Sequence, residues 1–213
     1  MKTIAEQLGE FVSQLRATGL PQEVLWKAKS CVLYGLSIAM AAHDSRQARI
    51  AEAAITDGES LSRGGSTTIL SGRKATAGAA AFANGVLFQS RGQSDAYGTM
   101  AHFGPAVVTS VLALAEAQGH PGRDIIPALV AGYEVAGALA KDHIRLTVER
   151  GWRGSPTYDV AAAAAAPDAT TAPLIRLRRE RDCFTCLVGC SSLLIGITPL
   201  HGQRSAGRNT TPR

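Results

Sequence analysis

The segment from Arg91 to His102 carries the side chains of this chain that are best suited to chemistry. It brings arginine, aspartate, tyrosine, threonine and histidine close together in a stretch interrupted by glycines. A glycine-bearing loop between helices can shape a pocket. Acid-base chemistry on an anionic substrate needs a base, an acid and cations that hold the negative charge. The segment contains a candidate for each role.

His102 and Asp95 are the two catalytic candidates in this segment. Histidine side chains titrate near neutrality and serve as proton donors or acceptors. The alternative for His102 is a loop histidine that caps the helix expected from Pro105. Asp95 is expected to orient His102 or to bind a substrate hydroxyl, and its alternative is an Asx-turn residue.

Four further side chains are candidates for substrate binding. Arg91 and Arg153 have the planar donor fork that binds carboxylates through two parallel hydrogen bonds. Either arginine could instead be a solvated surface residue, which is the more frequent case. Tyr97 and Thr99 are weaker candidates, because packing in the loop or core explains them equally well.

Local sequence signals predict an all-α architecture that would position this loop. Thr3-Ile4-Ala5-Glu6 forms a capping-box pattern, and apolar residues follow it at helical spacing. Helices are expected at 4–15, 24–42, 45–55, 77–88, 105–117, 124–148 and 160–166. No long stretch alternates with a period of two, so 66–71 is expected to be an extended loop and not a strand.

The character of the sequence changes at Pro167, which predicts two regions, 1–166 and 167–213. The second region has no lysine, carries a charge run at 176–182 and is expected to be loop-like from Asp168. It is interpreted as a poorly ordered tail, either the product of a shifted reading frame or a divergent, disordered end. Cys183, Cys186, Cys190 and His201 could hold zinc, but their spacing favours unpaired thiols, so no metal is expected.

The distribution of charge argues against a nucleic-acid partner. Residues 1–166 contain 15 Lys and Arg against 14 Asp and Glu, so most of the net charge of +5 belongs to the tail. A nucleic-acid binder would gather its basic residues on a folded face. No signal peptide and no membrane-spanning stretch are recognised, so a cytoplasmic protein without a membrane partner is expected.

Several segments resemble, in order and spacing, proteins of the MmgE/PrpD family. They are Gly19-Leu20-Pro21-Gln22-Glu23-Val24, Ala81-Phe82-Ala83-Asn84-Gly85-Val86-Leu87, Ala131-Gly132-Tyr133-Glu134-Val135 and Arg150-Gly151-Trp152-Arg153. The resemblance covers about residues 3–166. It implies the N-terminal helical domain of a lyase, with a second α+β domain further along the chain.

The resemblance implies a cofactor-independent reaction on a methylcitrate- or aconitate-like polycarboxylate, by dehydration or decarboxylation, in an enzyme that commonly forms homodimers. His102 stands where the family has a histidine, whereas Arg153 replaces a second histidine and Phe103 a proline. Of the common Asp-Phe-Asp-Asp-Thr run, only Asp95 is kept.

A further family lysine would lie beyond residue 166, where no match is found, so the chain is expected to be incomplete and inactive alone. The alternative is a non-catalytic helical protein that keeps only the packing or dimerisation surface.

Overall fold

The computed structural model describes residues 2–98 and 101–170. Helices dominate this part of the chain, and three very short strands join them, which confirms the predicted helical architecture. In chain order the elements are α1 (Ile4–Gln14), η1 (Ala17–Gly19), α2 (Gln22–Ala41), α3 (Arg46–Ala53), β1 (Ser60–Leu61), β2 (Ser66–Thr67), β3 (Lys74–Ala75), α4 (Ala77–Gln89), α5 (Gly104–Gln118), α6 (Gly122–Ala140), α7 (Ile144–Glu149) and α8 (Gly154–Thr170).

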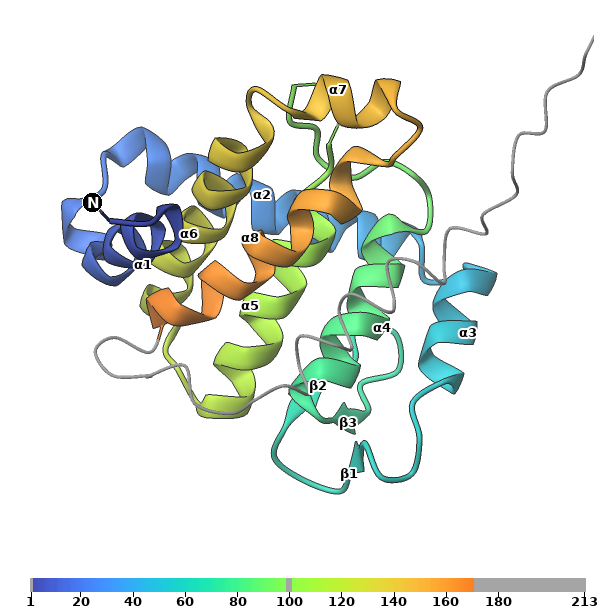
Figure 1. The fold of residues 1–213 in the computed structure, drawn as a ribbon. Helices are drawn as coiled ribbons and strands as arrows, with labels where there is room; N and C mark the ends of the chain where they lie inside the picture. Colours follow the sequence, from blue (N-terminus) through green and yellow to red (C-terminus); the bar gives the residue numbers. More distant parts are fainter. Residues whose placement is uncertain (1, 99–100, 171–213) are drawn as a thin grey trace, which may run out of the picture.

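The order in which the helices lie side by side differs from their order along the chain. α8 lies between α5 and α6, α4 packs on the other side of α5, and α3 packs against α4 (Figure 1). α2 contacts α4, α5 and α6, and the loop between α4 and α5 joins this bundle near α8. α8 therefore packs between two core helices and also reaches the loop that carries the candidate residues.

Side-chain caps explain why the early helices begin where the sequence predicted. The Thr3 hydroxyl accepts from the Glu6 N–H and the Glu6 carboxylate accepts from the Thr3 N–H, which completes the predicted capping box. Ser45 caps α3 and Thr76 caps α4 in the same way, by accepting a backbone N–H three residues on. These local hydrogen bonds fix helix starts without help from distant residues.

Three predictions about elements were wrong. The helix expected over 124–148 is interrupted at 141–143, where exposed polar residues form a turn between α6 and α7. α8 begins at Gly154 and continues to Thr170, so residues 168–170, expected to be loop-like, are helical. The stretch expected to be an extended loop contributes β2 to a three-stranded antiparallel sheet of order β1-β3-β2, because β3 supplies backbone partners on both sides.

Small residues allow the helices to approach closely in the core. Buried alanines line α4, α6 and α8, and Phe88, Phe103 and Leu129 fill the spaces between helices. At Gly35 of α2, a Cβ atom would lie 2.3 Å from the ring of Phe88, so only glycine fits this crossing. The close crossing of α2 and α4 therefore depends on the missing side chain at position 35.

α2 has a second face that the described residues leave uncovered. Trp26, Leu33 and Met40 follow one another at intervals of seven residues and are 66%, 68% and 75% exposed. Among the described residues, α2 is also the one helix with the length and apolar composition of a membrane span, which the sequence interpretation did not expect. Core helices and signal sequences share these properties, so this is weak evidence for a membrane.

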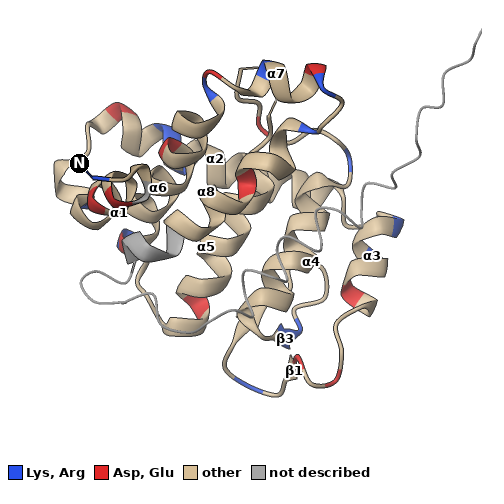
Figure 2. Cartoon of the chain, in the orientation of Figure 1, with Lys and Arg blue, Asp and Glu red and all other residues tan. Residues whose placement is uncertain are grey.

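Charged residues are scattered over several elements in Figure 2 and do not form a basic cluster on the face shown. Most of α4, α5 and α8 is uncharged in this view. That the helical region does not bind nucleic acid remains a prediction from the sequence.

Candidate functional site

Asp95 anchors the loop between α4 and α5 with both of its carboxylate oxygens. Oδ1 accepts the N–H of Gly104 at 2.9 Å, at the first turn of α5. Oδ2 accepts the phenol of Tyr133, on α6, at 2.8 Å. A Cβ at position 104 would lie 2.4 Å from Oδ1, so this contact depends on glycine. The carboxylate thus ties the loop to two helices, as a side chain that caps a helix start.

The ring of His102 is held by a backbone carbonyl of the same loop. Nδ1 lies 2.7 Å from the carbonyl oxygen of Asp95, and the His102 N–H donates to the Ser155 hydroxyl at 2.7 Å. Because a carbonyl oxygen only accepts, Nδ1 carries the proton in the neutral ring, and Nε2 has the free lone pair. Nε2 has no partner among the described residues. The arrangement presents one ring nitrogen as a possible base.

Asp159 is a half-buried acid on α8, one helical turn after Ser155. Its Oδ1 is buried and has no hydrogen-bond partner among the described residues. Burial, first, and the negative charge of Asp95, second, raise the pKa of the Asp159 carboxyl to about 8. Asp159 therefore holds a proton at neutral pH, close enough to Asp95 for one charge to influence the other.

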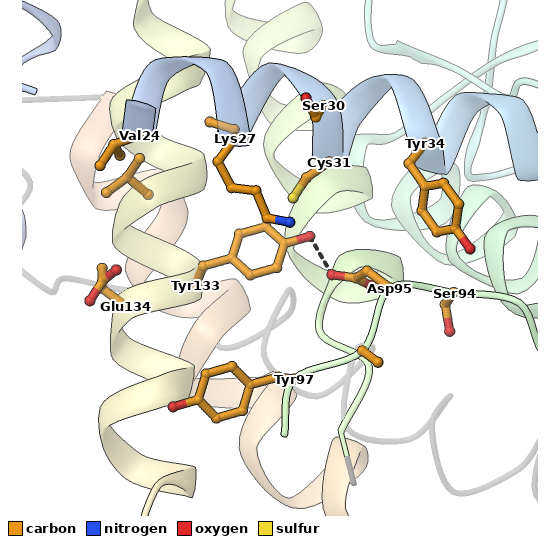
Figure 3. A pocket seen from close by; sticks show the side chains of 13 residues that line it. Val24, Lys27, Ser30, Cys31, Tyr34, Ser94, Asp95, Tyr97, Tyr133 and Glu134 are labelled. Carbon is orange, nitrogen blue, oxygen red and sulfur yellow. Dashed lines mark hydrogen bonds between the residues drawn. The ribbon is translucent and has the colours of Figure 1, made fainter. Parts of the chain in front are cut away.

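A cavity with a volume of about 740 Å³ lies on the other side of the loop, between α2 and α6. Lys27, Cys31 and Tyr34 of α2, Tyr133 of α6 and Tyr97 of the loop are in its lining (Figure 3). Burial is the main cause that raises the pKa of both the Cys31 thiol and the Tyr133 phenol, and the charge of Asp95 adds to each. Both groups are neutral at physiological pH.

The structure brings two of the predicted site residues into contact and places the others apart from them. Asp95 and His102 are adjacent, but the backbone carbonyl of Asp95, and not its carboxylate, contacts the histidine. Tyr97 lies in the cavity wall and donates to the carbonyl of Gly137 at 3.3 Å. Its ring is tilted against that of Phe103, with centroids 5.3 Å apart.

The two predicted arginines lie outside the cavity. Arg91 forms an exposed ion pair with Asp44, with Nη2 2.9 Å from Oδ1. Arg153 is exposed at the residue before α8. Thr99 lies outside the described residues, as do Cys183, Cys186, Cys190 and His201. No cluster of three potential metal ligands occurs in the described ranges.

Sequence reasoning missed Lys27, Cys31, Tyr133 and Asp159. Asp159 did leave a signal, because it is an acid four residues after Ser155 at the start of an alanine run. Lys27, Cys31 and Tyr34 also share one face of α2 at helical spacing. Nothing in the sequence says that this face meets Tyr133, because that contact joins distant helices.

The profile of the MmgE/PrpD N-terminal domain matches residues 6–173 of this chain. The chain belongs to the MmgE/PrpD family. A cis-aconitate decarboxylase-like protein from Aspergillus oryzae is 29% identical over 173 residues, which cover 76% of this chain and 35% of that protein. The chain thus spans about a third of the relative it matches. The resemblance seen in the sequence is confirmed, and the matched region includes the loop, the cavity and all of α8.

Proposed function

We propose that this chain carries the His102 part of a lyase of the MmgE/PrpD type, acting on a small methylcitrate- or aconitate-like polycarboxylate. The observation that carries the proposal is the ring orientation of His102, fixed by the 2.7 Å contact between Nδ1 and the Asp95 carbonyl. Family membership and the decarboxylase-like relative support it. Both reactions of this type require proton transfer beside a carboxylate, which a histidine with one free ring nitrogen can perform.

In this proposal, Nε2 of His102 takes or returns a proton at the substrate, and the contacts of Asp95 and Ser155 keep the ring in place. A fixed base reduces the reorganisation needed at the transition state. Arg153 and Thr99 remain predicted carboxylate-binding residues, and Arg91 must leave Asp44 to take that role. The chain alone is expected to turn over 2-methylcitrate and cis-aconitate far more slowly than typical enzymes, because the family site includes residues of a second domain.

A titration of citrate, read by chemical shifts, tests the site without requiring turnover. Binding should weaken with salt, because the charges of an exposed site are screened. His102→Ala should weaken citrate binding, because the substitution removes the ring that faces the substrate in this proposal. His43→Ala is the matched control, because His43 is exposed and its Nδ1 also contacts a backbone carbonyl, 2.9 Å away. Binding that ignores His102→Ala would place the site elsewhere.

A second candidate function, a helical association module without catalysis, is favoured by the uncovered face of α2. Trp26, Leu33 and Met40 form an apolar stripe that a partner helix could cover. Sedimentation at two concentrations would detect self-association, including the predicted homodimer. Leu33→Glu should abolish it, whereas Ile50→Glu, at an exposed position of α3, should leave it unchanged.

A further inference from the structure

The cavity between α2 and α6 offers one free positive charge. Among the described residues of its lining, Lys27 is the only lysine or arginine, and its side chain extends from α2 toward the phenol of Tyr133 (Figure 3). Its ammonium group has no ion pair or hydrogen bond with any described residue. The charge of Lys27 acts on the Cys31 thiol, whose raised pKa it opposes. The ammonium therefore sits at the cavity and is available to a ligand.

The phenol groups of the cavity are already engaged with the protein. Tyr34 donates to the Gln93 carbonyl at 2.6 Å, and Tyr133 and Tyr97 donate to Asp95 and to the Gly137 carbonyl. The tyrosines consequently offer ring surface to a ligand more than hydrogen bonds. Val24, Ala28 and Val130 extend this apolar lining. The body of a fitting ligand is therefore apolar or aromatic.

The negative charges of the lining limit how many carboxylates a ligand can bring. Asp95 and Glu134 both line the cavity, against the one ammonium of Lys27. Asp95 is held as an acceptor by Tyr133 and Gly104, so it does not neutralise Lys27 directly. Further carboxylates of a ligand would meet these acids without a second cation, and like charges at short range repel.

We propose that this cavity is a binding site for a small monocarboxylate with an apolar or aromatic body, with its carboxylate on Lys27 and its body against the tyrosine rings. This site is separate from the proposed lyase site, because His102 is not in the cavity lining. The two sites share only the loop that holds Asp95.

The test uses the full chain and three probes: 3-phenylpropanoate, its uncharged counterpart 3-phenylpropan-1-ol, and citrate. The propanoate should bind most tightly and shift the resonances of Lys27, Cys31 and Tyr133. Lys27→Gln should weaken the propanoate roughly tenfold, as expected for loss of a charge-assisted contact. The same variant should change the affinity for the alcohol by less than roughly twofold. Lys27→Arg should restore most of the propanoate affinity.

Lys29→Gln is the matched control, because Lys29 is an exposed lysine of the same helix outside the cavity lining. It should change propanoate binding by less than about twofold, the small effect of an exposed charge. Bound propanoate should also slow alkylation of Cys31 by N-ethylmaleimide, followed peptide by peptide with mass spectrometry.

Three results would overturn the proposal: no propanoate binding to the wild-type chain, equal weakening by Lys27→Gln and Lys29→Gln, or tighter binding of citrate than of propanoate at Lys27. His102→Ala separates this test from that of the lyase site. Propanoate binding should survive that substitution, whereas the citrate binding proposed for the lyase site should not.

Discussion

The loop between α4 and α5 has two sides that differ in how their polar groups are satisfied. Toward α2 and α6, the Asp95 carboxylate and the tyrosine hydroxyls are all paired within the protein. Toward α8, Nε2 of His102 and Oδ1 of Asp159 have no partner among the described residues. One side therefore anchors the loop, and the other leaves groups that can exchange protons. Buried polar groups without partners are costly, and they are found most often where function retains them.

The largest effect is expected from Asp95→Ala, which removes the anchor itself. The N–H of Gly104 and the phenol of Tyr133 would both lose a charged acceptor, so the free energy of unfolding should fall by roughly 3–5 kcal/mol. Urea unfolding followed by far-UV circular dichroism measures this. Asp142→Ala, in the exposed turn before α7, is the control and should cost under about 0.5 kcal/mol. Equal losses in the two variants would show that the contacts of Asp95 contribute no more to stability than an exposed surface aspartate does.

Asp159→Asn tests the α8 side of the loop through the pH dependence of the free energy of unfolding. The folded-state pKa of about 8 lies above that of an unfolded aspartate, so the folded protein keeps a proton that the unfolded chain releases. The contribution of this carboxyl to the free energy of unfolding is fully present below the pKa of the unfolded state. It is lost as the pH rises toward 8. The wild-type free energy of unfolding, relative to that of Asp159→Asn, should fall by roughly 3–4 kcal/mol from pH 5 to pH 8.

Histidine titration affects the wild type and Asp159→Asn alike, so the difference between their unfolding free energies isolates Asp159. A difference that stays flat with pH would contradict the raised pKa of this carboxyl. Asp95→Asn should reduce the slope only in part, because burial, and not the charge of Asp95, is the main cause of the shift.

Tyr133→Phe removes one hydrogen bond from the anchored side and leaves the Gly104 contact intact. A loss of about 1–2 kcal/mol is expected, because the phenol donates to a charged acceptor at a half-buried position. Tyr34→Phe is the matched variant, since its exposed hydroxyl donates to a neutral carbonyl and should contribute less. Urea unfolding of both variants checks this order, and the reverse order would place the anchor at Tyr34.

The smallest effect is expected from Arg91→Ala. The ion pair between Arg91 and Asp44 is exposed, and such pairs contribute up to about 0.5 kcal/mol, less in salt. Unfolding at low and high ionic strength measures this contribution. A loss above about 1 kcal/mol would mean that the loop is also anchored outside its two helix contacts.

The helix starts were predictable because the side chains that cap them are close in sequence to the groups they bond. Thr3, Ser45 and Thr76 each bond within three residues, so the sequence alone reveals their caps. The strands were missed because each has two residues, and pairing of Ser66 with Ala75 depends on how the intervening turn folds. The break after α6 was missed because the helical periodicity continues across it.

The site shows the same division between local and distant causes. Asp95 and His102 were predicted to act together from their closeness in sequence, and they do touch. Which atom of Asp95 makes the contact depends on the loop conformation, which spacing does not encode. The partners Tyr133 and Lys27 come from other helices, so only tertiary packing reveals them.

The uncovered face of α2 has a spectroscopic consequence. Trp26 and Trp152, the two tryptophans of the chain, are 66% and 70% exposed in the folded protein. Their indole rings already meet water, so their emission should change little when urea unfolds the chain. Any molecule that covers α2 would move Trp26 into an apolar environment and shift its emission to shorter wavelength. In this protein, intrinsic fluorescence therefore reports association more faithfully than it reports folding.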